Sequence, residues 1–233
     1  MKLSKYSNVL VVAAHPDDEA LGCGGLMSKL AQDGSKVTSI FLADGVSSRY
    51  EYNQKESWNN ELNERRHACV QAAKILGSQS PIFHDFPDNQ LDQIPLLHLS
   101  REIEKHIDTL SPDLILTHFS GDLNLDHRKV SEAVITAARP SVGSYPTEIW
   151  AFEVPSSTEW NALTNSDFKP NVFIEVKDQV RSKLEALSEY NFEMREFPHP
   201  RSEKAIMALL EWRGSNSGLQ NAEAFTQLRR IIR

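Results

Sequence analysis

The chain has 233 residues, of which 40% are apolar and 24% are charged, a composition typical of one compact globular domain. Its 25 Lys and Arg residues against 32 Asp and Glu residues give a formal net charge of −7, which disfavours the basic surface that a nucleic-acid partner requires. The two cysteines, Cys23 and Cys69, form no Cys-x-x-Cys pattern, so the composition excludes a disulfide framework and a cysteine zinc knuckle.

The first predicted elements form a β-α-β unit. Residues 9–14 are a continuous, Val-rich apolar run, which is typical of a parallel strand buried on both faces. A helix is predicted over residues 25–32, closed by Gly34, and a second strand over residues 37–42.

The middle of the chain alternates helices with short strands. Residues 49–60 are polar and aromatic without a clear period, which indicates a loop, and a long ordered loop in a compact domain is usually functional. The residues after this loop predict, in order, a helix over 61–76, a strand over 81–83, a helix over 96–110, a strand over 113–117 and, beyond a polar loop, a helix that ends near residue 138.

The last third of the chain predicts strands over 148–154 and 171–176, followed by helices over 179–191, 203–211 and 222–232. There is no repeat, low-complexity tract or Pro/Gly-rich linker, so we expect one domain over residues 1–233. Strands that alternate with helices predict a mostly parallel sheet with helices on both faces. The expected fold is therefore a single Rossmann-like, three-layer α/β domain.

The sequence predicts no membrane segment. The longest early apolar run, residues 9–14, is far shorter than the roughly 20 residues that a bilayer span needs. The residues before it lack the apolar core and the cleavage site of a signal peptide. We therefore expect a cytoplasmic protein.

Two polar segments follow predicted strand ends. Residues 15–19, His-Pro-Asp-Asp-Glu, come directly after the first strand, and residues 118–127 come directly after the strand over 113–117. In open α/β sheets the ligand crevice lies outside the carboxyl ends of the strands. We therefore expect both segments to open on the same edge of the sheet.

The side chains in these two segments are of the metal-ligand type. A hydrolytic zinc site takes three protein ligands and leaves one position for water, and His15, Asp18 and His127 meet this count. Asp17 lies beside Asp18 and is free to point elsewhere, so it is a candidate to accept a proton from water that the metal activates.

These motifs resemble those of a known family. Residues 14–19, Ala-His-Pro-Asp-Asp-Glu, the following Gly-Cys-Gly-Gly at 22–25, and residues 122–128, Asp-Leu-Asn-Leu-Asp-His-Arg, together resemble the LmbE-like (PIG-L) family of zinc-dependent de-N-acetylases. This family includes the N-acetylglucosaminyl-phosphatidylinositol, mycothiol-pathway and bacillithiol-pathway deacetylases. Weaker similar features are Asp44-Gly45, Arg213-Gly214, Gly218 and the Ala-Glu-Ala-Phe run at 222–225.

The resemblance implies a role for several residues. It assigns His15, Asp18 and His127 as ligands of Zn²⁺ or another divalent metal, Asp17 as the general base and Asp126 as the partner of a ligand. Some family members are monomers and others assemble into larger rings. The resemblance therefore leaves the oligomeric state undecided between a monomer and a homo-oligomer.

One position departs from the family pattern. Many members have a histidine where this chain has Asn124, and in those members the histidine assists the oxyanion or the leaving group. Asn donates a hydrogen bond to an oxyanion but cannot give up a proton at neutral pH. Two candidates for the general acid therefore remain. Asp17 could act first as base and then as acid, or His118, in the same loop as Asn124, could be the acid.

Arg49, Asp44 and His118 are the candidates for substrate contact. Arg49 is either a substrate-binding cation or a solvated charge. Asp44 either orients substrate hydroxyls or caps the turn with Gly45.

The sequence thus predicts a zinc-dependent hydrolase that removes an acetyl group from a small N-acetylated amino sugar or its conjugate, with water activated by the metal and Asp17. One alternative is metal-dependent hydrolysis of another small amide or ester, and another is metal binding without catalysis. A third is a nucleotide-binding oxidoreductase that uses the glycines at 22–25, although Met27 stands where a Gly-x-Gly-x-x-Gly motif needs its third glycine.

Overall fold

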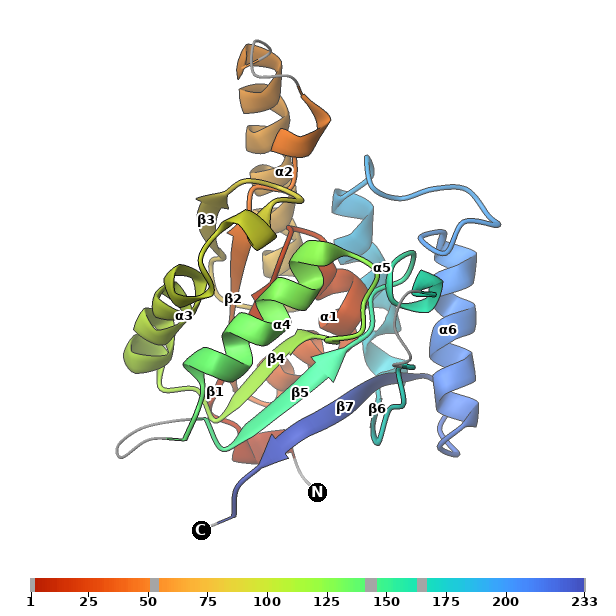
Figure 1. The fold of residues 1–233 in the computed structure, drawn as a ribbon. Coiled ribbons are helices and arrows are strands. Elements are labelled where there is room, and N and C mark those ends of the chain that lie inside the picture. The colour runs from red at the N-terminus through yellow and green to blue at the C-terminus, as the bar shows by residue number, and fades with distance from the viewer. Residues whose placement is uncertain (1–2, 51–54, 141–145, 163–166, 233) are drawn as a thin grey trace.

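The computed structural model describes residues 3–50, 55–140, 146–162 and 167–232, and these form a layered α/β structure (Figure 1). In this part of the chain, seven strands make one sheet in the order β3-β2-β1-β4-β5-β7-β6. The strands are β1 Asn8–Ala13, β2 Lys36–Ala43, β3 Ile82–Phe86, β4 Leu114–His118, β5 Glu148–Phe152, β6 Val172–Glu175 and β7 Ala222–Arg230. The first five are parallel, whereas β7 runs antiparallel between β5 and β6.

Helices cover both faces of the sheet (Figure 1). They are α1 Asp18–Gln32, α2 Lys55–Leu76, α3 Leu96–Leu110, α4 Leu125–Ala137, α5 Val180–Glu189 and α6 Glu203–Ser215. Helices α1, α2 and α5 pack together on one face, α3 and α4 pack on the other, and α6 lies against β7. Within the described residues, none of the helices combines the length and the apolarity that crossing a bilayer takes.

Strand β1 shows why the sheet is buried on both faces. Val9 and Val11 belong to the apolar cluster beneath α1, α2 and α5, whereas Leu10 and Val12 belong to the cluster beneath α3 and α4. Successive side chains of a strand point to opposite faces, so an unbroken apolar run fills two cores at once. The predicted three-layer α/β fold with a mostly parallel sheet is confirmed.

The prediction of a helix over residues 222–232 is wrong, because Ala222–Arg230 forms strand β7. Its Ala, Glu, Leu and Arg residues favour a helix when considered locally. The segment instead fills the gap between β5 and β6 and pairs with both strands. Tertiary pairing overrides local propensity here.

Two further boundaries differ from the prediction. Helix α2 begins at Lys55, so the predicted loop over 49–60 is wrong from that residue onward, and residues 51–54 lie outside the described part. Helix α1 begins at Asp18 instead of residue 25, with a kink at Cys23, whose φ is −145° and ψ is 18°. The first turn of α1 therefore belongs to the polar segment after β1.

The strand order reverses between β1 and β4. Strands β2 and β3 lie on one side of this pair, and β5 with its antiparallel neighbours lies on the other. Such a reversal opens a crevice at the carboxyl ends of the two strands, where ligands bind in open α/β folds. The two polar segments singled out in the sequence follow these two strands.

Candidate metal centre

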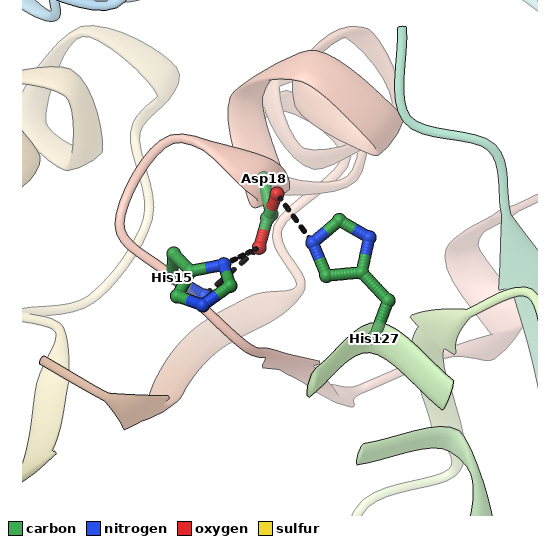
Figure 2. Close-up of side chains that lie close together, drawn as sticks. All are labelled: His15, Asp18 and His127. Atoms are coloured by element: carbon green, nitrogen blue, oxygen red, sulfur yellow. Dashed lines mark hydrogen bonds and ion pairs between the residues drawn. The ribbon is translucent and has the colours of Figure 1, made fainter. Parts of the chain in front are cut away.

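The two segments after β1 and β4 meet at one point (Figure 2). His15, Asp18 and His127 each offer a ligand atom, and these atoms lie within 4.8 Å of one another. His15 Nδ1 is 3.4 Å from Asp18 Oδ2, and His127 Nε2 is 3.3 Å from Asp18 Oδ1. All three residues are buried. The structure therefore brings together the three predicted metal ligands.

Local hydrogen bonds set the position of each ligand. The backbone N–H of His15 donates to Asp18 Oδ2 over 2.8 Å, and the N–H of Asp18 donates to the His15 carbonyl over 3.2 Å. Asn124 is the N-cap of α4: its Oδ1 accepts from the N–H groups of Asp126, at 2.8 Å, and His127, at 3.4 Å. An N-cap satisfies the free N–H groups of the first helical turn, and this turn carries His127.

Carboxylates orient both imidazole rings from behind. Asp122 Oδ1 lies 3.1 Å from His127 Nδ1. Asp88 Oδ1 and Asp126 Oδ2 lie 2.9 Å and 3.1 Å from His15 Nε2. Such partners fix the tautomer of a ligand histidine and turn its other nitrogen toward the metal. Sequence reasoning did not assign Asp88 to the site, and the signal that could have identified it is its place just after the carboxyl end of β3.

The chemistry of this donor set fits a divalent cation. Asp18 Oδ1 is buried and has no hydrogen-bond partner among the residues that the structure describes, and a buried polar atom without a partner is costly. Burial lowers the pKa of His127, but the carboxylates of Asp18 and Asp122 outweigh burial and raise the pKa to about 9. The same negative surroundings favour a cation. Two imidazoles and one carboxylate are a common ligand set for zinc.

Removing the charge behind His127 tests this arrangement. Asp122→Asn keeps an oxygen acceptor but loses the negative charge that faces His127 Nδ1. We expect zinc affinity, measured by competition with a chelator, to fall about 10–100-fold. The same change at Asp108, which is exposed on α3, is the control. An unchanged affinity in Asp122→Asn would contradict the orienting role.

Asp17 lies next to the three ligands. Its backbone φ is 138°, in the region that non-glycine residues rarely adopt, and such a conformation costs about 1–3 kcal/mol and is typical of functional sites. The side chain is buried, and its Oδ2 accepts a hydrogen bond of 2.8 Å from Arg201 Nη1. Burial raises the pKa of Asp17 to about 6, although Arg201 opposes the shift. The group is thus a carboxylate at neutral pH and a competent proton acceptor.

The predicted substrate-contact residues have other partners. Asp44 is buried, and its Oδ1 accepts from the N–H groups of Val46 and Ser47, both at 2.8 Å. The structure therefore places Asp44 in the turn-capping role of the two that the sequence left open. Arg49 pairs with Glu61 and Glu193, at 2.6 Å and 2.5 Å.

His118 is placed beneath the site. It is fully buried, its Nε2 accepts a 2.9 Å hydrogen bond from the N–H of Ala14, and its ring stacks on His127 at 3.9 Å between centroids. Burial lowers the pKa of His118 to about 3, so the ring is neutral. This placement corrects the prediction that His118 contacts substrate or acts as the general acid.

Asp126, expected from the resemblance to be the partner of a ligand, lies against His15 and supports its neighbours. It is fully buried, and its two oxygens accept from the N–H groups of Asn89, at 2.7 Å, and Leu91, at 3.0 Å. Together with the contact to His15, these bonds tie the loop after β3 to a metal ligand. These contacts assign Asp126 a role in positioning His15.

The glycines at 22–25 serve close packing. They lie within α1, and among the described residues none of them has a positive φ. A Cβ atom at Gly22 would collide with the ring of Phe152, and one at Gly25 would lie 2.9 Å from Val176. They do not form the strand-to-helix loop that binds a dinucleotide. The glycines therefore do not support the alternative of a nucleotide-binding oxidoreductase.

The chain is similar in sequence and in fold to known deacetylases. A family model described as PIG-L, GlcNAc-PI de-N-acetylase, matches residues 10–138. An uncharacterised deacetylase of Escherichia coli K12 is 28% identical over 195 residues, which cover 80% of this chain and 92% of that protein. The diacetylchitobiose deacetylase of Thermococcus kodakarensis is 28% identical over 230 residues, which cover 92% of this chain and 80% of that protein.

A solved structure shows the same fold. The N,N'-diacetylchitobiose deacetylase of Pyrococcus horikoshii matches with a TM-score of 0.78 at 19% identity, over 97% of this chain and 85% of that one. The family model spans more than half of the chain and includes the segments after β1 and β4. The chain therefore belongs to the PIG-L (GlcNAc-PI de-N-acetylase) family.

Proposed function

We propose that the protein is a zinc-dependent hydrolase that removes the acetyl group from an N-acetylated amino sugar or a conjugate of one. The observation that carries the proposal is the buried set His15, Asp18 and His127, with the Asp17 carboxylate beside it, at the crevice between β1 and β4. Relatives named for an acetylated sugar substrate, diacetylchitobiose, support this substrate class.

The chemistry divides between the ion and the chain. When bound, a divalent ion supplies Lewis-acid chemistry that polarises the acetamide and lowers the pKa of water. Asp17 accepts one proton as the water oxygen bonds to the carbonyl carbon. It then returns that proton to the nitrogen as the C–N bond breaks, so acetate and a free amine leave. Asp17 is thus both base and acid, because His118 is buried and neutral.

Asn124 is the proposed hydrogen-bond donor to the developing oxyanion. Its Oδ1 is used by the N-cap of α4, which directs the side chain through two backbone bonds and leaves the amide NH₂ group as a donor. Donors that are fixed before the reaction stabilise an oxyanion without reorganisation. The amide cannot give up a proton, so this role is binding only.

Acetate release tests the proposal. The protein is stripped with a chelator, reloaded with zinc and assayed on N-acetylglucosamine conjugates that carry phosphate, inositol, malate or a second sugar. We expect acetate and free amine in equal amounts, lost on chelation and restored by zinc. Stoichiometric zinc without acetate from any conjugate would contradict the proposal, and acetate from O-acetyl esters alone would establish the esterase alternative.

A further inference from the structure

Arg201 is the feature of the site that no sequence motif predicts. It lies between α5 and α6, 184 residues after Asp17, and its Nη1 donates to Asp17 Oδ2 over 2.8 Å. The other oxygen of Asp17, Oδ1, makes no hydrogen bond to any residue in the described part of the chain. The two oxygens of one carboxylate therefore have different partners.

The backbone alone does not fix the Asp17 side chain. Asp17 precedes the first turn of α1 without a capping hydrogen bond from its own side chain. Its backbone N–H is held by Glu19 Oε2 at 3.0 Å, and the hydroxyl of Tyr190 holds the other Glu19 oxygen at 2.6 Å. These bonds fix where the Cα of Asp17 lies but leave the carboxylate free to rotate. Arg201 removes that freedom.

Arg201 is itself held rigidly. Its Nε donates to Ser156 Oγ over 2.8 Å, and its Nη1 lies 3.3 Å from Glu193 Oε2. Glu193 also pairs with Arg65, which donates to the carbonyl of Pro16 over 3.1 Å. The network thus returns to the residue directly before Asp17. Arg201 and the Asp17 backbone are parts of one connected frame.

We infer that Arg201 is a positioning residue for Asp17, which holds Oδ2 so that Oδ1 is the oxygen that exchanges the proton. The inference rests on the proposed deacetylase function. The planar guanidinium suits this task because it bonds Ser156, Glu193 and Asp17 in fixed directions. A misplacement of about 1 Å at a reacting group lowers the rate about 100-fold, so the frame has a direct effect on kcat.

A double-mutant cycle tests the inference in the zinc-loaded, full-length protein. The variants are Arg201→Met, Arg201→Lys, Asp17→Asn and the double variant Asp17→Asn/Arg201→Met. The control is Arg195→Met, since Arg195 lies in the same segment and, in the described part of the chain, its side chain donates to the carbonyls of Phe192 and Met194.

We expect Arg201→Met to lower kcat about 10–100-fold and to leave KM nearly unchanged. Arg201→Lys should recover part of the loss, because an ammonium holds the carboxylate but not the three partners together. In the Asp17→Asn background, Arg201→Met should have almost no further effect on kcat. Arg195→Met should resemble the wild type.

Two kinetic outcomes would overturn the inference. An equal loss of kcat with and without the Asp17 carboxylate would show that Arg201 acts elsewhere, and an effect confined to KM would make it a substrate contact. Thermal unfolding of the wild type, Asp17→Asn, Arg201→Met and the double variant gives a second readout, because a real contact makes the two substitutions non-additive. Additive shifts in Tm would overturn the inference. A wild-type protein that releases no acetate would instead refute the proposed function, and the positioning role would fall with it.

Discussion

Replacing Asp17 with Asn is expected to lower kcat for acetate release by about 10²–10⁴-fold, the range that one general acid–base group contributes. Asn preserves the shape of the side chain and can still accept the hydrogen bond from Arg201 Nη1. It cannot accept a proton from water or return one to the amine. Two neighbouring groups that titrate have other positions: Asp18 faces the two histidines, and the buried His118 stacks on His127.

The measurement needs controls for metal content and for folding. Zinc bound per protein should match the wild type, since Asp17 is not among the three predicted ligand residues, and unfolding should stay a single cooperative transition. Asp108→Asn makes the same chemical change at an exposed position of α3 and should retain full activity. If Asp17→Asn with full zinc kept more than about one tenth of the wild-type kcat, Asp17 would not be the general base.

The proximity of His15, Asp18 and His127 could be predicted because each residue lies in the segment that follows the carboxyl end of a strand. His15 and Asp18 are three residues apart after a buried strand, and His127 follows a second strand whose carboxyl end is at the same sheet edge. Because β1 and β4 are neighbouring parallel strands, their carboxyl ends lie side by side and bring these residues together. The same rule identified neither Asp88 as a partner of His15 nor the burial of His118, since these depend on how loops and rings pack.

Other parts of the site come from residues with no local signal. Arg201 lies in the segment between α5 and α6, and it reaches Asp17 because α5 packs on α1 and α2 while α6 packs on β7. Strand β7 was mispredicted as a helix for a related reason: its residues favour a helix locally, while its partners β5 and β6 are distant in sequence. Contacts between distant segments are what a single sequence does not reveal.

Strand β7, which the sequence predicted as a helix, also explains the kink in α1. Glu223 of β7 accepts from the N–H groups of Gly25 and Leu26 at 2.8 Å and 2.7 Å, so it caps the second half of the broken helix. Lys183 of α5 donates to the Leu21 carbonyl at 2.8 Å, which satisfies the end of the first half. Helix ends leave such groups without intrahelical partners, and here two side chains supply them.

Lys183 and Glu223 are in turn paired with each other. Lys183 Nζ lies 2.6 Å from Glu223 Oε1, and the two side chains are only 2% and 3% exposed. A buried charge is tolerated only when it is paired and hydrogen-bonded. Here the two side chains also make the hydrogen bonds to the backbone of α1 on either side of its kink. The half-helix that they hold in place begins at Asp18, so this pair supports one of the three predicted metal ligands.

Breaking this pair should have the largest effect on stability. We expect Lys183→Met to lower the free energy of unfolding by about 3–5 kcal/mol, because it leaves the Glu223 carboxylate buried without its counter-charge. Glu223→Gln should also be destabilising, and the double variant should lose less than the sum of the two, because it leaves no unpaired charge. Urea unfolding of the metal-free proteins measures all three without contribution from zinc binding.

Arg181→Met provides the matched control. Arg181 lies on the same helix as Lys183 and pairs with Glu185, but its side chain is 89% exposed, so its loss should leave the unfolding midpoint almost unchanged. Because Asp18 depends on the first half of α1, Lys183→Met should also weaken zinc binding, whereas Arg181→Met should not. Equal unfolding midpoints for the two variants would mean that the kink in α1 is stable without the buried pair.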